Sequence, residues 1–330
     1  MLVKATNRGT QFLACMIVFA AAAPRSLAKD QAPGVSPAEL VRRAVNNEIA
    51  ANSGPELHFM FKDHKQTAHL SQTKLVVETR DATAGMLISQ DDHPLTPQQR
   101  QAEEARLENY IHNPEELNKK RKQEKEDADH TTRILKALPD AFLYEPEGTE
   151  NSSETVGRQG DQLVKLKFHP NPSYVPPTRV EQVLTGMSGY LLIDPKENHV
   201  AEIDGTLQKE VGFGWGILGH LDRGGRFFVQ QADVSDGHWE LTRMELSFTG
   251  KILLFKRLNI RSSDVFTSFR PVPDLSFAQG VELLKKEVAQ DESVAGPPQR
   301  KTGDAKATRP PDTSKQQTKD AAQNNVCCDR

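Results

Sequence analysis

The chain has 330 residues, of which 36% are hydrophobic and 26% are charged, and its formal net charge is −3. This composition is typical of a soluble protein and excludes membrane-embedded and collagen-like classes. A near-neutral charge also gives no support to nucleic-acid binding, which requires a basic face. Without the two terminal segments described next, roughly 260 residues remain, enough for a large domain with a substantial core.

The first 28 residues have the pattern of an export signal. Lys4 and Arg8 precede an uninterrupted apolar run from Phe12 to Ala23, and Ser26-Leu27-Ala28 supplies the small residues of a cleavage site. An apolar helix of that length rises only about 18 Å, too short for the ~30 Å hydrocarbon core of a bilayer. We therefore expect residues 1–28 to be a signal peptide, the protein to be exported to the periplasm or the extracellular space, and no transmembrane anchor.

The C-terminal segment, residues 289–330, is polar and is expected to be disordered, because it has too little apolar surface to form a core. Cys327 and Cys328 lie at its end, where they cannot brace the domain. They could form a strained ring, pair with another chain, bind a soft metal or have no function. The sequence leaves these alternatives open.

The remaining residues, 29–288, are expected to form a single domain with helices near its start. Glycine is absent from Met86 to Glu147, and because glycine is costly inside helices this region is predicted to be helical. Proline after a capping residue marks each helix start. The predicted helices are Pro37–Ala50, Pro97–Ile111 and Pro114–Leu138, of which the last two form a helical insertion over residues 97–138.

Elsewhere the sequence alternates between apolar and polar residues, which predicts strands. Val164, Leu166 and Phe168 alternate with lysines in this way. Short connections force neighbouring strands to be antiparallel, since a parallel return needs a long crossover. The predicted strands are Glu56–Lys62, Thr73–Thr79, Gly85–Ser89, Ala141–Glu145, Gln162–Phe168, Gly189–Asp194, His199–Leu207, Arg226–Val234, Trp239–Thr249 and Lys251–Phe269.

Three of the strand connections are predicted to be tight hairpins, at residues 194–198, 235–237 and 249–250. One face of each strand is apolar and the other polar, so one face of the sheet is expected to meet water. The predicted fold class is α+β, with a large curved antiparallel sheet in the form of a half-open barrel and helices packed on its concave apolar face.

A glycine-rich segment, residues 214–219, fits the spacing of the dinucleotide-binding fingerprint. That fingerprint requires a helix directly after it, and Arg223-Gly224-Gly225 prevents one. We interpret the segment as a loop whose Phe213 and Trp215 cover one end of the core, or as an apolar flap over a cavity.

The densest polar set lies near this loop and consists of His220, Asp222, Asp233, Asp236, His238 and Glu240. A His–Asp pair could serve general acid–base catalysis. Without a nucleophile motif, these residues are interpreted first as turn residues, which aspartate favours. No catalytic residue, metal site or cofactor is predicted.

The order of elements resembles the outer-membrane lipoprotein-sorting superfamily. Residues 237–244, followed by Thr249-Gly250-Lys251, are similar to the penultimate strand of that family, and residues 189–194 with 199–203 are similar to an earlier hairpin. The resemblance implies an unclosed barrel that shelters acyl chains. The residues implied to line its cavity are Val164, Leu166, Phe168, Met244, Leu246 and Phe248, to which we add Phe213 and Trp215 as contacts with the ligand. The alternative for the first six is an ordinary closed core, and the sequence leaves both open.

The leading hypothesis is therefore a periplasmic, non-enzymatic binding protein for an apolar small molecule, such as a lipid or a lipoprotein acyl chain. One alternative is a structural or interaction module that docks on another cell-envelope protein through the charged helices Pro97–Leu138. A second is an exported hydrolase that uses His220, Asp222 or His238. Nucleic acid is not expected as a partner.

Overall fold

A computed structural model describes residues 35–51, 57–213, 219–252 and 256–295 of the chain. The chain divides into two compact units, Met1–Leu284 and Lys285–Arg330. The sheet belongs to the first unit, and of the second unit only the end of one helix is described. The signal peptide predicted at residues 1–28 and the two C-terminal cysteines lie outside the described residues.

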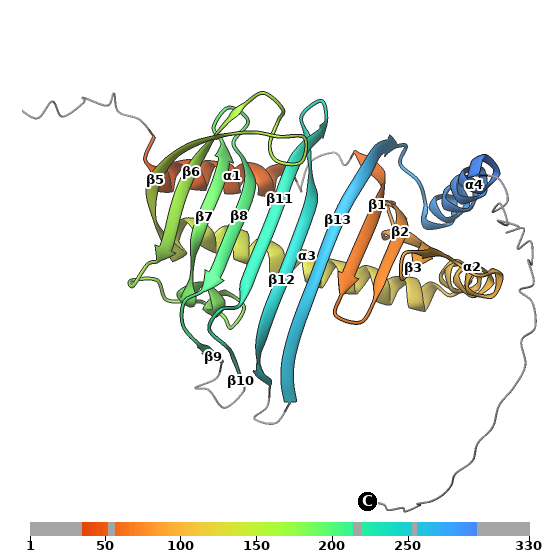
Figure 1. The fold of residues 1–330 in the computed structure, drawn as a ribbon, viewed down its shortest axis with the longest axis horizontal. Helices are drawn as coiled ribbons and strands as arrows, with labels where there is room; N and C mark the ends of the chain where they lie inside the picture. The colour runs from red at the N-terminus through yellow and green to blue at the C-terminus, as the bar shows by residue number, and fades with distance from the viewer. Residues whose placement is uncertain (1–34, 52–56, 214–218, 253–255, 296–330) are drawn as a thin grey trace, which may run out of the picture. The chain divides into compact units, whose positions relative to one another are not determined.

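The first unit is built on one 13-stranded antiparallel sheet (Figure 1). The strand order β4-β3-β2-β1-β13-β12-β11-β8-β7-β6-β5 is an open path, so the sheet is not closed into a barrel. The strands are β1 (His58–Thr67), β2 (Ser71–Val77), β3 (Ala84–Gln90), β4 (His93–Pro94), β5 (Phe142–Asn151), β6 (Gln162–Pro170), β7 (Met187–Asp194), β8 (His199–Leu207), β9 (Val211–Phe213), β10 (Gly219–Leu221), β11 (Arg226–Ser235), β12 (His238–Ile252) and β13 (Lys256–Val272).

The helices are α1 (Pro37–Ala51), α2 (Pro97–His112), α3 (Pro114–Ala141), the short 3-10 helix η1 (Glu181–Gly186) and α4 (Phe277–Ala295). Two of the longer helices, α2 and α3, begin at side-chain caps that the sequence provides. At the start of α2, Thr96 and Gln99 form a reciprocal capping box. The side chain of Asn113 accepts a hydrogen bond from the Glu116 amide at the start of α3.

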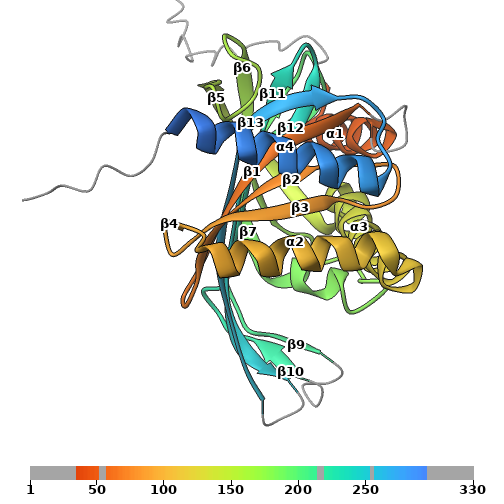
Figure 2. The ribbon, with the colours of Figure 1, turned by 90° about the vertical axis from the view of Figure 1, so that its right-hand side faces the viewer.

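Helices α1 and α3 and the 3-10 helix η1 cover one face of the sheet (Figures 1 and 2). Val41 and Val45 of α1 and Leu138 of α3 join a buried cluster with Leu191 and Ile193 of β7. The opposite face of the same strands has a second, smaller cluster, in which Leu192 packs with Val156, Leu163 and Ala201. The strand alternation thus separates the two faces as predicted, and the predicted fold class is confirmed.

The other half of the sheet is covered by α2 and the first part of α4. Leu107 of α2 and Phe277, Val281 and Leu284 of α4 are buried, and the Phe277 ring contacts Tyr110 edge-on. Gly280 lets α4 approach β2 closely, because a Cβ there would lie 2.7 Å from the Thr79 side chain. Helix α4 was not predicted, and it spans residue 288, where the domain was expected to end.

The hairpins predicted at residues 194–198 and 235–237 are present, between β7 and β8 and between β11 and β12. The hairpin predicted at Thr249-Gly250 is wrong, because both residues lie inside β12, where Gly250 is opposite Leu258. A Cβ on Gly250 would lie 2.1 Å from the carbonyl oxygen of His220 in β10. This glycine therefore allows β10 to lie against β12 and does not mark a turn.

Candidate ligand cavity

A cavity of about 1060 Å³ lies in the first unit between the covered face of the sheet and the helices. Most of its lining side chains are apolar. From the helices they include Ile134, Leu135, Leu138, Val183 and Leu184. From the strands they include Phe168, Met187, Leu191, Ile203, Phe213, Leu221, Phe227, Val229, Met244 and Phe248.

Polar lining residues gather at one end of this cavity. His199 lies at the start of β8, Gln231 late in β11 and Glu240 early in β12, and these three strands are antiparallel neighbours. The three residues therefore lie at the same end of the sheet. Glu48 at the end of α1 and Glu78 after β2 complete this polar end.

The cavity reaches solvent at lining residues that are themselves exposed. Leu57, His130 and His238 line the cavity and are exposed. Leu57 directly precedes β1, and His238 is the first residue of β12, close to Glu240.

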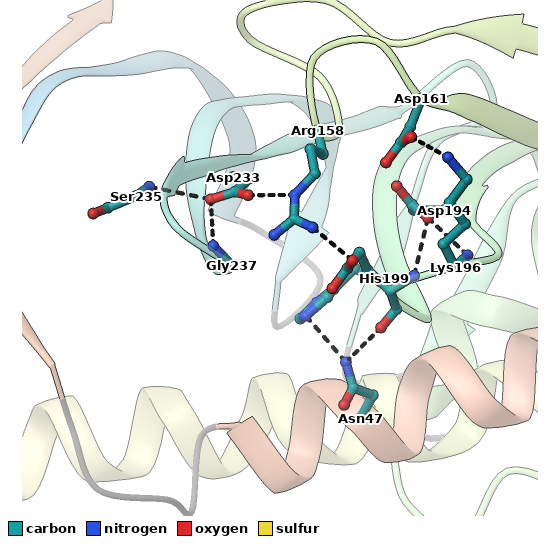
Figure 3. Close-up of polar contacts among 10 residues, drawn as sticks. Asn47, Arg158, Asp161, Asp194, Lys196, His199, Asp233, Ser235 and Gly237 are labelled. Atoms are coloured by element: carbon teal, nitrogen blue, oxygen red, sulfur yellow. Dashed lines mark hydrogen bonds and ion pairs between the residues drawn. The ribbon is translucent and has the colours of Figure 1, made fainter.

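His199 anchors α1 to the sheet beside the cavity (Figure 3). Its Nδ1 lies 3.0 Å from Glu48 Oε1, and its Nε2 lies 3.0 Å from the amide nitrogen Nδ2 of Asn47. An amide NH₂ only donates, so Nε2 must accept and Nδ1–H must donate to Glu48. The ring is also stacked on Trp239, with centroids 4.6 Å apart.

Among the residues of the polar end, Glu240 has a carboxyl group with a strongly raised pKa. Burial, followed by the nearby carboxylates Glu78 and Glu48, raises its pKa to about 8. The other two carboxylates accept backbone hydrogen bonds, Glu78 from Phe59 and Glu48 from Val200. For the Glu240 carboxyl, no hydrogen bond or ion pair is found within the described residues. A pKa in this range favours the protonated form of this cavity-lining residue at neutral pH.

A polar network outside the cavity holds the ends of the strands together (Figure 3). Arg158 donates at 2.6 Å to Asp233 and at 2.6 Å to Glu197, joining the β11–β12 hairpin to the β7–β8 hairpin. Although burial acts in the opposite direction, the hydrogen bond from Arg158 keeps the pKa of Asp233 below its usual value. Asp233 also accepts from the amides of Ser235 and Gly237, so this residue, which was interpreted as a turn residue but lies in β11, holds the following turn through its side chain.

Four of the eight residues named from the sequence line the cavity: Phe168, Phe213, Met244 and Phe248. Leu166 is instead buried in the adjoining core, and Val164 packs against that core. Leu246 is opposite Phe227, on the lining face of β12, but is not itself a lining residue. Trp215 lies outside the described residues.

Sequence reasoning missed the wall formed by helices. Ile134, Leu135 and Leu138 line the cavity from α3, where they form an apolar stripe at helical spacing. This apolar stripe could have indicated from the sequence that α3 contributes to the wall of the cavity. Charges earlier in α3 pair along the helix, as in the half-buried pair Lys120–Glu124 and the exposed pair Lys125–Asp129. Such pairing is typical of a solvated helix face.

The two histidines named for a hydrolase lie far apart. His220 is opposite Lys251 near the end of β12, whereas His238 begins that strand, a separation of about 40 Å at the rise of a strand. His220 Nε2 instead lies 3.3 Å from Asp222 and 4.0 Å from Glu210. The nitrogen and oxygen atoms of these three side chains that could bind a metal lie within 4.8 Å of one another, a grouping that direct polar contacts between the imidazole and the two acids also explain.

Fold and cavity together define an α+β protein with an open antiparallel sheet and a large, mainly apolar cavity beneath its helices. None of the described helices is both long and apolar enough to cross a membrane. The sequence matches no protein-family model and no curated protein.

The solved structures that are similar to this chain include the following two. One is a domain from Vibrio parahaemolyticus assigned to outer-membrane lipoprotein sorting, with 8% identity, coverage of 74% of this chain and 99% of that chain, and a TM-score of 0.28. The other is a DUF1329 family protein from Desulfovibrio piger, with 9% identity, coverage of 72% and 95%, and a TM-score of 0.23. The first match agrees with the resemblance named from the sequence. Both TM-scores are too low for ligands or residue roles to be carried over.

Proposed function

We propose that this chain is an exported binding protein that shelters the apolar chain of a lipid-like amphiphile. The observation that carries the proposal is the cavity of about 1060 Å³ lined mainly by apolar side chains. That volume is at the upper end of the range for ligand sites, about 300–1,000 Å³. The signal pattern of residues 1–28 supports export, and the proposed role is binding without catalysis.

The separation of polar and apolar lining supports one orientation of the ligand. Its chain would lie against Leu191, Ile203 and Phe248, and its head would lie near Glu48, Glu78 and Glu240. An anionic head is disfavoured at this end, because it would add to the negative charge that Glu78 and Glu48 already place around Glu240. The three carboxyl groups favour a head that donates hydrogen bonds, above all an amine.

Native mass spectrometry of the purified protein tests occupancy, with solvent extraction to identify the adduct. The extracted protein is then titrated with dodecylamine by calorimetry. We expect a bound amphiphile in the first experiment and saturable binding in the second. A folded wild-type protein that carries no lipid and binds no dodecylamine would contradict the proposal.

A matched pair of variants assigns the binding to the cavity. Val229→Trp places an indole among lining residues, whereas Val175→Trp adds the same side chain at a position that is 82% exposed. Displacing about two buried methylenes of the ligand costs about 1.6 kcal/mol. We therefore expect binding at least about tenfold weaker in Val229→Trp and unchanged in Val175→Trp.

A further inference from the structure

The far end of the β12–β13 hairpin is strongly basic in an otherwise acidic chain. Residues 246–263 contain no aspartate or glutamate, although the whole chain has a formal charge of −3. Four cations occur in this stretch, Lys251, Lys256, Arg257 and Arg261, and all four are exposed. We call these four residues the basic tip.

Strand pairing concentrates the charges of the basic tip. Lys251 lies directly opposite Arg257, and Arg261 lies opposite Ser247 on the neighbouring strand. Since side chains alternate between faces, Lys251, Arg257 and Arg261 share one face of the hairpin. Like charges placed opposite each other destabilise a sheet, so this arrangement costs stability in the isolated protein.

Two cations near the basic tip, one on β11 and one on β12, form ion pairs with acids. Arg226 donates to Asp204 and Glu245, and Arg243 also pairs with Glu245. No hydrogen bond or ion pair of the four basic-tip side chains is found in the described parts of the chain. Two acids beside the adjoining strands, Glu210 just before β9 and Asp222 just after β10, lie against His220.

The basic tip lies at the apolar end of the cavity. Strands β9 and β10 extend beside the far ends of β12 and β13 in both views (Figures 1 and 2). Phe213 of β9, Leu221 of β10 and Phe248 of β12 line the cavity. The free charges are therefore presented next to the part of the molecule that would hold an acyl chain, and away from Glu240.

We propose that the basic tip docks this protein on an anionic phospholipid surface. A cluster of unpaired Lys and Arg side chains is attracted by the negative potential of such a membrane.

Vesicle co-sedimentation tests the proposal. The purified protein is mixed with vesicles of phosphatidylcholine alone or of phosphatidylcholine with phosphatidylglycerol. Each lost cation is expected to lower the partition coefficient about fivefold, so the triple variant Lys251→Gln/Arg257→Gln/Arg261→Gln should bind mixed vesicles about 100-fold more weakly. Arg261→Gln alone should bind about fivefold more weakly, which preserves the test if the triple variant does not fold.

The control variant Lys119→Gln/Lys122→Gln/Lys136→Gln removes the same charge from exposed positions of α3 and should bind like the wild type. Residues 1–28 are the same in every protein compared, so any contribution from them cancels. Binding should require the anionic lipid and weaken with added salt. The proposal is overturned if the wild type does not bind mixed vesicles, if it binds neutral vesicles equally well, or if the α3 control loses as much binding as the triple variant.

Discussion

Glu48 and His199 are 151 positions apart in the chain, yet Glu48 Oε1 lies 3.0 Å from Nδ1 of His199. Both residues are buried. The same carboxylate oxygen also accepts a hydrogen bond from the backbone amide of Val200. One side chain of α1 thus satisfies two buried donors of β8 and fixes the helix at the polar end of the cavity.

Truncation of this carboxylate should destabilise the protein strongly. Glu48→Ala leaves two buried N–H donors unpaired, each worth about 1–3 kcal/mol, so we expect a loss of about 2–5 kcal/mol in urea unfolding. Glu48→Gln keeps an acceptor oxygen and should lose less. Glu39→Ala removes only the exposed ion pairs with Arg42 and Arg43 and should cost less than about 1 kcal/mol. Equal losses for Glu48→Ala and Glu39→Ala would show that α1 is not held by this contact.

The raised pKa of Glu240 makes stability depend on pH. Between the ordinary carboxyl pKa of 4.5 and the folded-state pKa of about 8, the native state holds a proton that the unfolded state has released. Stability should therefore fall as pH rises through this window, by about 1.4 kcal/mol per pH unit from this group. Glu240→Gln should remove that contribution and be more stable than the wild type at pH 8, with little difference at pH 4.5.

The control for this experiment is Glu154→Gln, which neutralises an exposed carboxyl in the loop before β6. It should leave the pH profile of unfolding unchanged. An identical pH dependence in wild type and Glu240→Gln would mean that Glu240 is ionised in the native state across this range.

Amine binding should be accompanied by proton release from Glu240. A cationic head near the carboxyl group favours its ionised form, which lowers its pKa from about 8. Titration with dodecylamine at neutral pH in buffers of different ionisation enthalpy measures the released protons. We expect up to about one proton per ligand for the wild type and a markedly smaller release for Glu240→Gln. Binding with equal proton release in both proteins would place the amine head away from Glu240.

The wall of the cavity depends on a close approach of two strands at Gly189. A Cβ at this position would lie 1.8 Å from the carbonyl oxygen of Asp204 in β8. Gly189→Ala should therefore cost about 3 kcal/mol or more, as overpacking against rigid backbone does. At Gly85, also in a strand, the nearest atoms would be 3.8 Å away, so Gly85→Ala should change stability by less than about 1 kcal/mol. Thermal unfolding distinguishes the two variants.

Much of the sheet could be predicted because its signal is local. The alternation of apolar and polar residues gave the bounds of β8, His199–Leu207, without error, and proline after a cap gave the starts of α2 and α3. Gly250 was misread because the sequence does not distinguish a glycine that turns the chain from one that lets a neighbouring strand approach. Only the pairing of β10 with β12 makes that distinction.

The candidate site was harder to predict than the fold. An amphipathic strand looks the same in sequence whether its apolar face closes a core, like Leu166, or lines a cavity, like Phe168. The polar end combines Glu48, Glu78 and Glu240 from α1, the end of β2 and β12. Strand β13 pairs with both β1 and β12 and so brings these distant segments together, which no local pattern encodes.

Photoaffinity labelling tests most directly whether the cavity holds an acyl chain. A long-chain alkylamine with a diazirine on its chain is irradiated with the extracted protein, and the labelled residues are mapped by tandem mass spectrometry. The account predicts labels on lining residues such as Met187, Ile203 and Met244, reduced by excess dodecylamine and by Val229→Trp. The account would be contradicted by labels confined to the opposite face of the sheet, around Leu163 and Leu192. It would also be contradicted if excess dodecylamine did not reduce the labelling.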